Sequence, residues 1–143
     1  IKHGWSKLFD VDILDAEGPD LELPIPNGKR IQKNLVGKDI KNYDSMLVLS
    51  HFKGHPMGGF GGALKQLSIG CASSAGKANI HGAGKPEEMW TTEQNAFLES
   101  MADAAESVVK LFDQRDEEHV RRLRLLRRGG GPVYERYRHS RLP

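Results

Sequence analysis

Cysteine is almost absent from this chain, since Cys71 is the only one among 143 residues. One thiol cannot close an internal disulfide, which fits a reducing compartment, and we expect a cytoplasmic protein. The sequence has no run of 18 apolar residues, so a helical membrane span is excluded. Hydrophobic residues make up 38% of the sequence and aromatic residues 7%, so we expect one domain with a small core.

Basic residues are unevenly distributed along the chain. Residues 1–114 carry a formal net charge of −3, whereas residues 115–143 carry +5. The basic residues of the first segment are lysines apart from Arg30, and those of the second segment are all arginines. Two different compositions therefore share one polypeptide.

Three short segments have the patterns of β-strands. Residues 9–15, FDVDILD, alternate apolar and acidic side chains, as a half-buried strand does. Residues 21–32 form two extended stretches around the turn signal Asn27-Gly28, and their prolines place them at a sheet edge. Residues 45–50, SMLVLS, are a continuous apolar run typical of a buried parallel strand.

Helical patterns lie between and after these segments. Residues 38–44 favour a short helix or turn, and residues 62–70 can begin a helix. Thr91 and Gln94 match a capping box. An apolar stripe at spacings of three and four follows, for which core packing is the favoured reading: Phe97, Met101, Ala104 or Ala105, Val108 and Phe112. The predicted fold class is α/β, with a partial mixed sheet, a strand–glycine-rich loop–helix unit and one long amphipathic helix.

The glycine-rich loop predicts a place where backbone approaches a ligand. Gly58, Gly59, Gly61 and Gly62 stand between the predicted strand and helix, an arrangement that offers backbone N–H groups to an anion. No nucleotide-binding P-loop is in register, because Lys65 is followed by glutamine and not by a hydroxyl residue. A looser anion site and a purely conformational loop remain equal alternatives.

Two histidines in this loop are candidate metal ligands or proton carriers. His51 and His55 lie four apart, but Pro56 opposes the helix that would place them on one face. A metal would need a third ligand, for which His81 and Cys71 are the nearby choices. The structural alternative is that each histidine bonds to backbone and stiffens the loop.

Two lysines and the cysteine of this region also have two readings each. Lys53 and Lys65 are ordinary surface lysines by default, and their place beside the glycines makes them candidate contacts for an anionic substrate or phosphate. Cys71 can act as a nucleophile beside a histidine, but a lone cysteine between glycine and alanine is more often a small buried hydrophobe.

A longer likeness covers this region. The string LVLSHFKGHPMGGFGGALKQLSIGCASSAGKANIH resembles the signature of iron–sulfur centre proteins, the uncharacterised family catalogued as domain of unknown function 362. The likeness extends over residues 1 to about 112. A fainter likeness is to nickel-dependent lactate racemases, which share the ten-residue spacing seen between His55 and Lys65.

The resemblance implies a function that spacing alone does not. Intact relatives are expected to be redox or metal-assisted enzymes, with an iron–sulfur cluster or metal and a ferredoxin-like redox partner. In such an enzyme His51 and His55 would bind metal or move protons, with His81 as a further ligand, while Lys53 and Lys65 hold an anionic substrate. A four-thiolate cluster is not expected here, because Cys71 stands alone.

The arginine-rich tail, residues 113–143, is predicted to be a separate, disordered or non-native segment after a partial domain of residues 1–112. Suitable codons for His119 to Leu126, read one nucleotide later, give MSVDCDC, and residues 134–142 in the same way give MKDIGILA. Both strings look like the family's own continuation, so we hypothesise a frameshift between about residues 112 and 118. The DNA sequence tests this directly.

The sequence therefore predicts a truncated, functionally impaired member of this family. The alternative is a non-catalytic module that grips a phosphate or another small anion with its glycine-rich loop. A nucleic-acid binder driven by the tail is the least favoured hypothesis. An open sheet edge would also favour a homo-oligomer.

Overall fold

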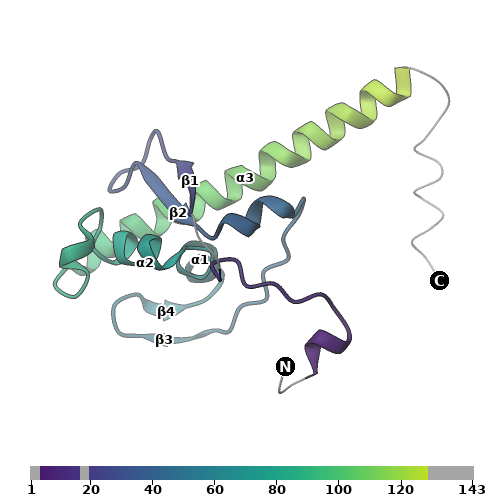
Figure 1. The fold of residues 1–143 in the computed structure, drawn as a ribbon. Coiled ribbons are helices and arrows are strands. Elements are labelled where there is room, and N and C mark those ends of the chain that lie inside the picture. Colours follow the sequence, from purple (N-terminus) through teal and green to yellow (C-terminus); the bar gives the residue numbers. More distant parts are fainter. Residues whose placement is uncertain (1–3, 17–19, 129–143) are drawn as a thin grey trace.

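A computed structural model describes residues 4–16 and 20–128 of the chain, with side chains given as far as Arg115 except at Trp5 (Figure 1). The described residues form two antiparallel sheets of two strands each, together with helices that are short apart from α3, Gln94–Arg128. The predicted α/β class is confirmed.

The first hairpin matches its prediction in part. Strands β1, Leu21–Pro24, and β2, Lys33–Val36, pair antiparallel with Leu21 opposite Val36. A bond of 2.8 Å from the Ile25 N–H to the Gln32 carbonyl continues the ladder into the loop that holds Asn27 and Gly28. The first stretch and the turn signal are therefore confirmed, whereas the second strand begins at Lys33, just beyond the predicted residues 21–32.

Helix α3 buries the apolar stripe that the sequence predicted. Strands β1 and β2, helix α2 (Ser74–His81) and the segment after helix α1 (Ala63–Lys65) all pack against it. Its buried apolar residues are Phe97, Met101, Ala104, Ala105 and Val108. Phe112 is half-buried at the edge of the core. These positions lie on one face of the helix, at 3.6 residues per turn. The core consists of two clusters of buried residues, and this one helix contributes side chains to both.

The predicted capping box at Thr91 and Gln94 is wrong. The Thr91 hydroxyl donates to the Glu88 carbonyl, 3.3 Å away, inside the preceding turn. The Glu93 carboxylate instead accepts from the N–H groups of Asn95 and Ala96, at 3.3 and 3.4 Å. An acidic side chain suits this position, because the first N–H groups of a helix have no partner within the helix.

Helix α2, Ser74–His81, lies against β2 at close range. The Ser73 hydroxyl caps it by accepting from the Gly76 N–H at 3.1 Å. A Cβ at Gly76 would stand only 2.0 Å from the Leu35 carbonyl oxygen, so only glycine permits this contact. This packing fixes the end of α2, where His81 lies.

Two predicted strands are wrong. Residues 9–15 and 45–50 form no strand in the part of the chain that the structure describes. Their apolar side chains are largely exposed, with Phe9 at 62%, Leu47 at 83% and Leu49 at 83%. A strand needs a neighbour to accept and donate its backbone hydrogen bonds, and the apolar pattern that predicted these two supplies no such neighbour.

Shorter helical turns complete the chain. A 3₁₀ turn, Lys38–Asn42, confirms the predicted short helix, and two others are Trp5–Lys7 and Pro86–Glu88. Helix α1, Ala63–Lys65, runs directly into a π-helical turn, Gln66–Gly70. The prediction that a helix begins after the glycine-rich loop is therefore confirmed.

Helix α3 continues through residues 113–128, beyond the predicted domain boundary at residue 112. Residues 129–143, which hold the rest of the predicted tail, lie outside the described residues. The boundary and the frameshift stay predictions. None of the helices in residues 4–16 and 20–128 combines the length and apolar content that crossing a bilayer needs.

Candidate functional site

The glycine-rich loop folds into a second hairpin, which the sequence did not predict. Strands β3, Lys53–His55, and β4, Gly59–Gly61, pair antiparallel with His55 opposite Gly59. Gly59 has φ of +70°, in the left-handed region that favours glycine, and it closes the turn after residues 56–58. The loop therefore has a defined backbone on which side chains can be placed.

Three side chains converge on one face of this hairpin. Lys53 and His55 are two residues apart on β3, so they point to the same face. Lys65 reaches that face from α1, because a Cβ at Gly61 would lie 3.5 Å from Lys65 Cδ and 3.8 Å from Lys53 Cγ. The side chains of two predicted anion contacts thus lie together on the same face of Gly61.

The ring of His55 is held in one tautomer. Its Nδ1 accepts a hydrogen bond of 3.0 Å from the Gly58 N–H. A neutral imidazole that accepts at Nδ1 carries its proton on Nε2, so His55 presents an N–H donor. Burial and then the positive charges of Lys65, His81 and Lys53 lower the pKa of His55, which favours this neutral form.

His81, the last residue of α2, is held in the opposite tautomer. Its Nδ1 lies 2.7 Å from the Lys77 carbonyl oxygen, which can only accept, so Nδ1 carries the proton. The ring stacks on Phe97, with centroids 5.0 Å apart. Phe97 also approaches the hairpin, since its Cε1 would lie 3.7 Å from a Cβ at Gly58. Phe97 therefore stacks on His81 and lies beside Gly58, the residue whose N–H bonds to His55.

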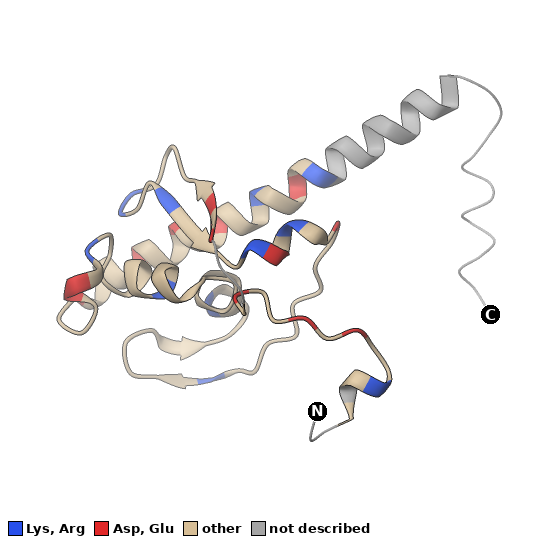
Figure 2. Cartoon of the chain, viewed as in Figure 1, with Lys and Arg blue, Asp and Glu red and all other residues tan. Residues whose placement is uncertain are grey.

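The cluster is electropositive. The charges that shift the pKa of His55 come from two lysines and a second histidine, with no carboxylate among them. Among the described residues Lys53 and Lys65 have no ion pair, whereas Lys77 lies 2.9 Å from Asp15. Figure 2 shows basic residues on β3 and α1, while acidic residues mark the extended segment after the first 3₁₀ turn.

The four glycines have different parts in this geometry. The Gly58 N–H is used within the loop by His55, and Gly59 supplies the positive φ. Gly61 and Gly62 are in ordinary contact with side chains, those of Lys53 and Lys65 at Gly61 and those of Phe52 and Phe60 at Gly62. The hairpin explains the glycines at 58 and 59, and any direct contact of the four with a ligand stays a prediction.

His51 does not join the cluster. It is exposed in the segment before β3, and its charge is not among those acting on His55. Within the described residues no three His, Cys, Asp or Glu side chains are placed to share a metal ion. The donor set therefore does not fit the metal site predicted at His51, His55 and His81.

Cys71 belongs to the core. It is 5% exposed and packs with Leu23, Val36, Ile40 and Val108. Burial raises the pKa of its thiol, which keeps it protonated and unreactive at neutral pH. Of its two readings, the small buried hydrophobe is the one that the structure supports.

Two residues near the cluster were not identified as site residues from the sequence. Phe97 was expected only as core, yet it stacks on His81. The Gln94 side chain donates a hydrogen bond of 2.9 Å to the Met57 carbonyl, which connects the hairpin loop to the start of α3. No sequence signal indicated either contact, because each joins residues of different elements, 37 positions apart in the case of Gln94 and Met57.

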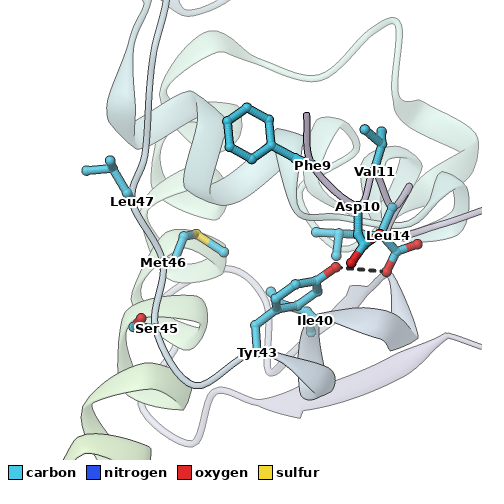
Figure 3. A pocket seen from close by; sticks show the side chains of 10 residues that line it. Phe9, Asp10, Val11, Leu14, Ile40, Tyr43, Ser45, Met46 and Leu47 are labelled. Carbon is cyan, nitrogen blue, oxygen red and sulfur yellow. Dashed lines mark hydrogen bonds between the residues drawn. The ribbon is translucent and has the colours of Figure 1, made fainter. Parts of the chain in front are cut away.

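An open pocket of about 590 Å³ lies elsewhere, between the extended segment 9–14 and residues 40–47 (Figure 3). Its lining is mainly apolar, and the Tyr43 hydroxyl donates to Asp12 at 3.0 Å, which raises the pKa of Tyr43. None of the predicted site residues lines it. This pocket separates the two segments wrongly predicted as strands.

The chain was compared with protein families, curated proteins and solved structures. The family described as Domain of unknown function (DUF362) matches residues 2–119, which is seven residues beyond the predicted end of the likeness. No curated protein and no solved structure matches the chain. Because the match covers most of the sequence, the chain belongs to the DUF362 family.

Proposed function

We propose that the β3–β4 hairpin and α1 form a binding site for a small anion, a phosphate or carboxylate group. The observation that carries this proposal is the convergence of Lys53 and Lys65 on one face of Gly61, the face that His55 also shares. Neither lysine is neutralised by a carboxylate among the described residues. Two cations held on one face attract an anion more strongly than a single surface lysine does.

The lowered pKa of His55 supports the same reading. A cation cluster without a counter-ion disfavours a further positive charge, so the imidazole stays neutral. An anion bound there would reverse this effect and raise the pKa of His55. A change in the pKa of His55 would therefore indicate that an anion has bound.

The same charges oppose a metal cation. A divalent ion at His55 or His81 would face the positive charges of Lys53 and Lys65, and the described residues give it no third ligand. Redox or metal-assisted chemistry, a ferredoxin-like partner, a homo-oligomer and a cytoplasmic location stay predictions. None of these four properties is tested by the contacts of the described residues.

Titration with inorganic phosphate tests the proposal. We expect binding that weakens as salt is raised and a higher pKa of His55 in the bound form, both followed by NMR. Replacing Lys53→Ala or Lys65→Ala should weaken binding about tenfold each, because each removes one charge-assisted contact.

The matched controls remove one positive charge as well, but from lysines that lie outside the proposed site. Lys33→Ala and Lys110→Ala remove exposed lysines that pair with Glu22 and Glu106. These variants should bind phosphate as the parent does. Equal losses in both pairs of variants would show only general charge attraction, and the site would then be rejected.

A further inference from the structure

The two histidines of the cluster present different atoms to a ligand. His55 accepts at Nδ1 from the Gly58 N–H, so its Nε2 carries a hydrogen and donates. His81 donates at Nδ1 to the Lys77 carbonyl, so its Nε2 has a lone pair and accepts. Backbone groups therefore fix one donor and one acceptor, and neither depends on rotation of a hydroxyl.

These rings are placed together by packing and not by sequence proximity. Phe97 stacks on His81 and lies beside Gly58, whose N–H holds His55. Phe97 is fully buried, so the stack is fixed by the core. Among the described residues no partner is found for Nε2 of either histidine, which leaves both atoms available to a ligand.

We propose that the site selects an oxyanion that still carries a proton, such as hydrogen phosphate or the monoanion of a phosphate monoester. This inference rests on the anion site proposed above and names its ligand class. The anionic oxygens face Lys53, Lys65 and the Nε2–H of His55. The remaining P–OH donates its hydrogen to Nε2 of His81.

Sulfate is the discriminating probe because it has the same shape and charge range but no hydrogen to donate. Placed in the same site, it would set an oxygen lone pair against that of His81 and leave a polar atom without a partner. Sites built to bond a particular hydroxyl reject analogues that lack it far more strongly than apolar pockets do.

Competition between inorganic phosphate and sodium sulfate near pH 8 tests the inference on the unmodified chain. We expect phosphate to bind at least about tenfold more tightly, the loss of one good hydrogen bond. Equal affinities, or a preference for sulfate, would overturn the inference and leave the anion site standing. Binding of neither anion would overturn both.

Replacing each histidine gives a second readout. His81→Asn keeps an amide hydrogen for the Lys77 carbonyl but removes Nε2, so the ratio of phosphate to sulfate affinity should fall close to one. His55→Asn keeps an acceptor for the Gly58 N–H and should weaken the binding of both anions alike. A preference for phosphate that persists in His81→Asn would contradict the assignment.

Discussion

The two hairpins of this protein are both antiparallel pairs of strands, but they differ in how they contact the rest of the fold. The β1–β2 hairpin contributes Leu23 and Val36 to the core and lies against α3. The β3–β4 hairpin leaves Lys53 and Phe60 exposed and directs charged side chains to one face. The first hairpin therefore stabilises the fold, whereas the second hairpin contributes few buried residues to it.

The contacts of each hairpin with α3 show the same contrast. In the first, the Asp103 carboxylate accepts from the N–H groups of Lys29, Arg30 and Ile31, at 3.1, 2.7 and 3.1 Å. In the second, the exposed side chain of Gln94 on α3 donates a hydrogen bond to the Met57 carbonyl. A loop held by a buried carboxylate is rigid, whereas a loop held at its surface can adjust to a ligand.

The largest expected effect is on the first hairpin. Asp103→Ala leaves three backbone N–H groups without their acceptor in a site where the carboxylate is only 8% exposed. We expect the free energy of unfolding to fall by about 3 kcal/mol, measured by urea denaturation. Asp103→Asn should lose less, because one oxygen remains to accept.

Its control is Glu106→Ala, on the exposed side of the same helix, where the carboxylate pairs with Lys110. This change should stay within about 0.5 kcal/mol. A comparable loss in both variants would mean that removing any carboxylate from this helix, and not the buried acceptor in particular, accounts for the effect.

A smaller effect is expected in the second hairpin. Gly59→Ala places a Cβ on a residue with φ of +70°, which costs about 1 kcal/mol. The comparison variant is Gly54→Ala in β3, where a Cβ would meet nothing within 4 Å. Unfolding in urea should therefore separate the two. If Gly59→Ala proved as costly as Asp103→Ala, the second hairpin would be as important to stability as the first.

The smallest effect is the pH dependence contributed by His55. Because its pKa in the folded chain is lower than the unfolded value of about 6.5, the unfolded chain binds the proton first as the pH falls. Stability should therefore decrease as the pH drops below about 6.5 and level off once the folded state is protonated too. His55→Asn should lack this component, as seen by comparing urea midpoints across the pH range. Identical pH profiles for the two proteins would refute the lowered pKa.

Sequence patterns predicted those parts of the fold whose partners lie nearby or on a regular helical face. The turn signal at Asn27-Gly28 gave the first hairpin, and the stripe from Phe97 to Val108 gave the buried face of α3. The strands expected at residues 9–15 and 45–50 failed, because apolar alternation does not specify which strand lies alongside. The Glu93 cap was missed because a capping box was expected two residues earlier.

The candidate site was predicted in the same partial way. The residue types at Lys53, His55, Lys65 and His81 indicated anion or proton chemistry, and their convergence was left open. The structure joins three of them through the hairpin and α1, and it leaves the exposed His51 outside. The sequence did not predict the positive charge of the cluster, because it depends on Lys53 and Lys65 lying close to His55 in space. From the sequence alone, the histidines of this loop suggested a metal site.

The sequence by itself determined the family, the mixed α/β class, the helical face of α3 and the kinds of groups available for chemistry. Those properties depend on the order of residues over short distances, which local geometry translates directly. Only the tertiary structure decided the tautomers of His55 and His81, the burial of Cys71 and the stacking of Phe97 on His81. Each of these depends on packing between residues distant in the chain or on hydrogen bonds set by the path of the backbone, which residue order alone does not reveal.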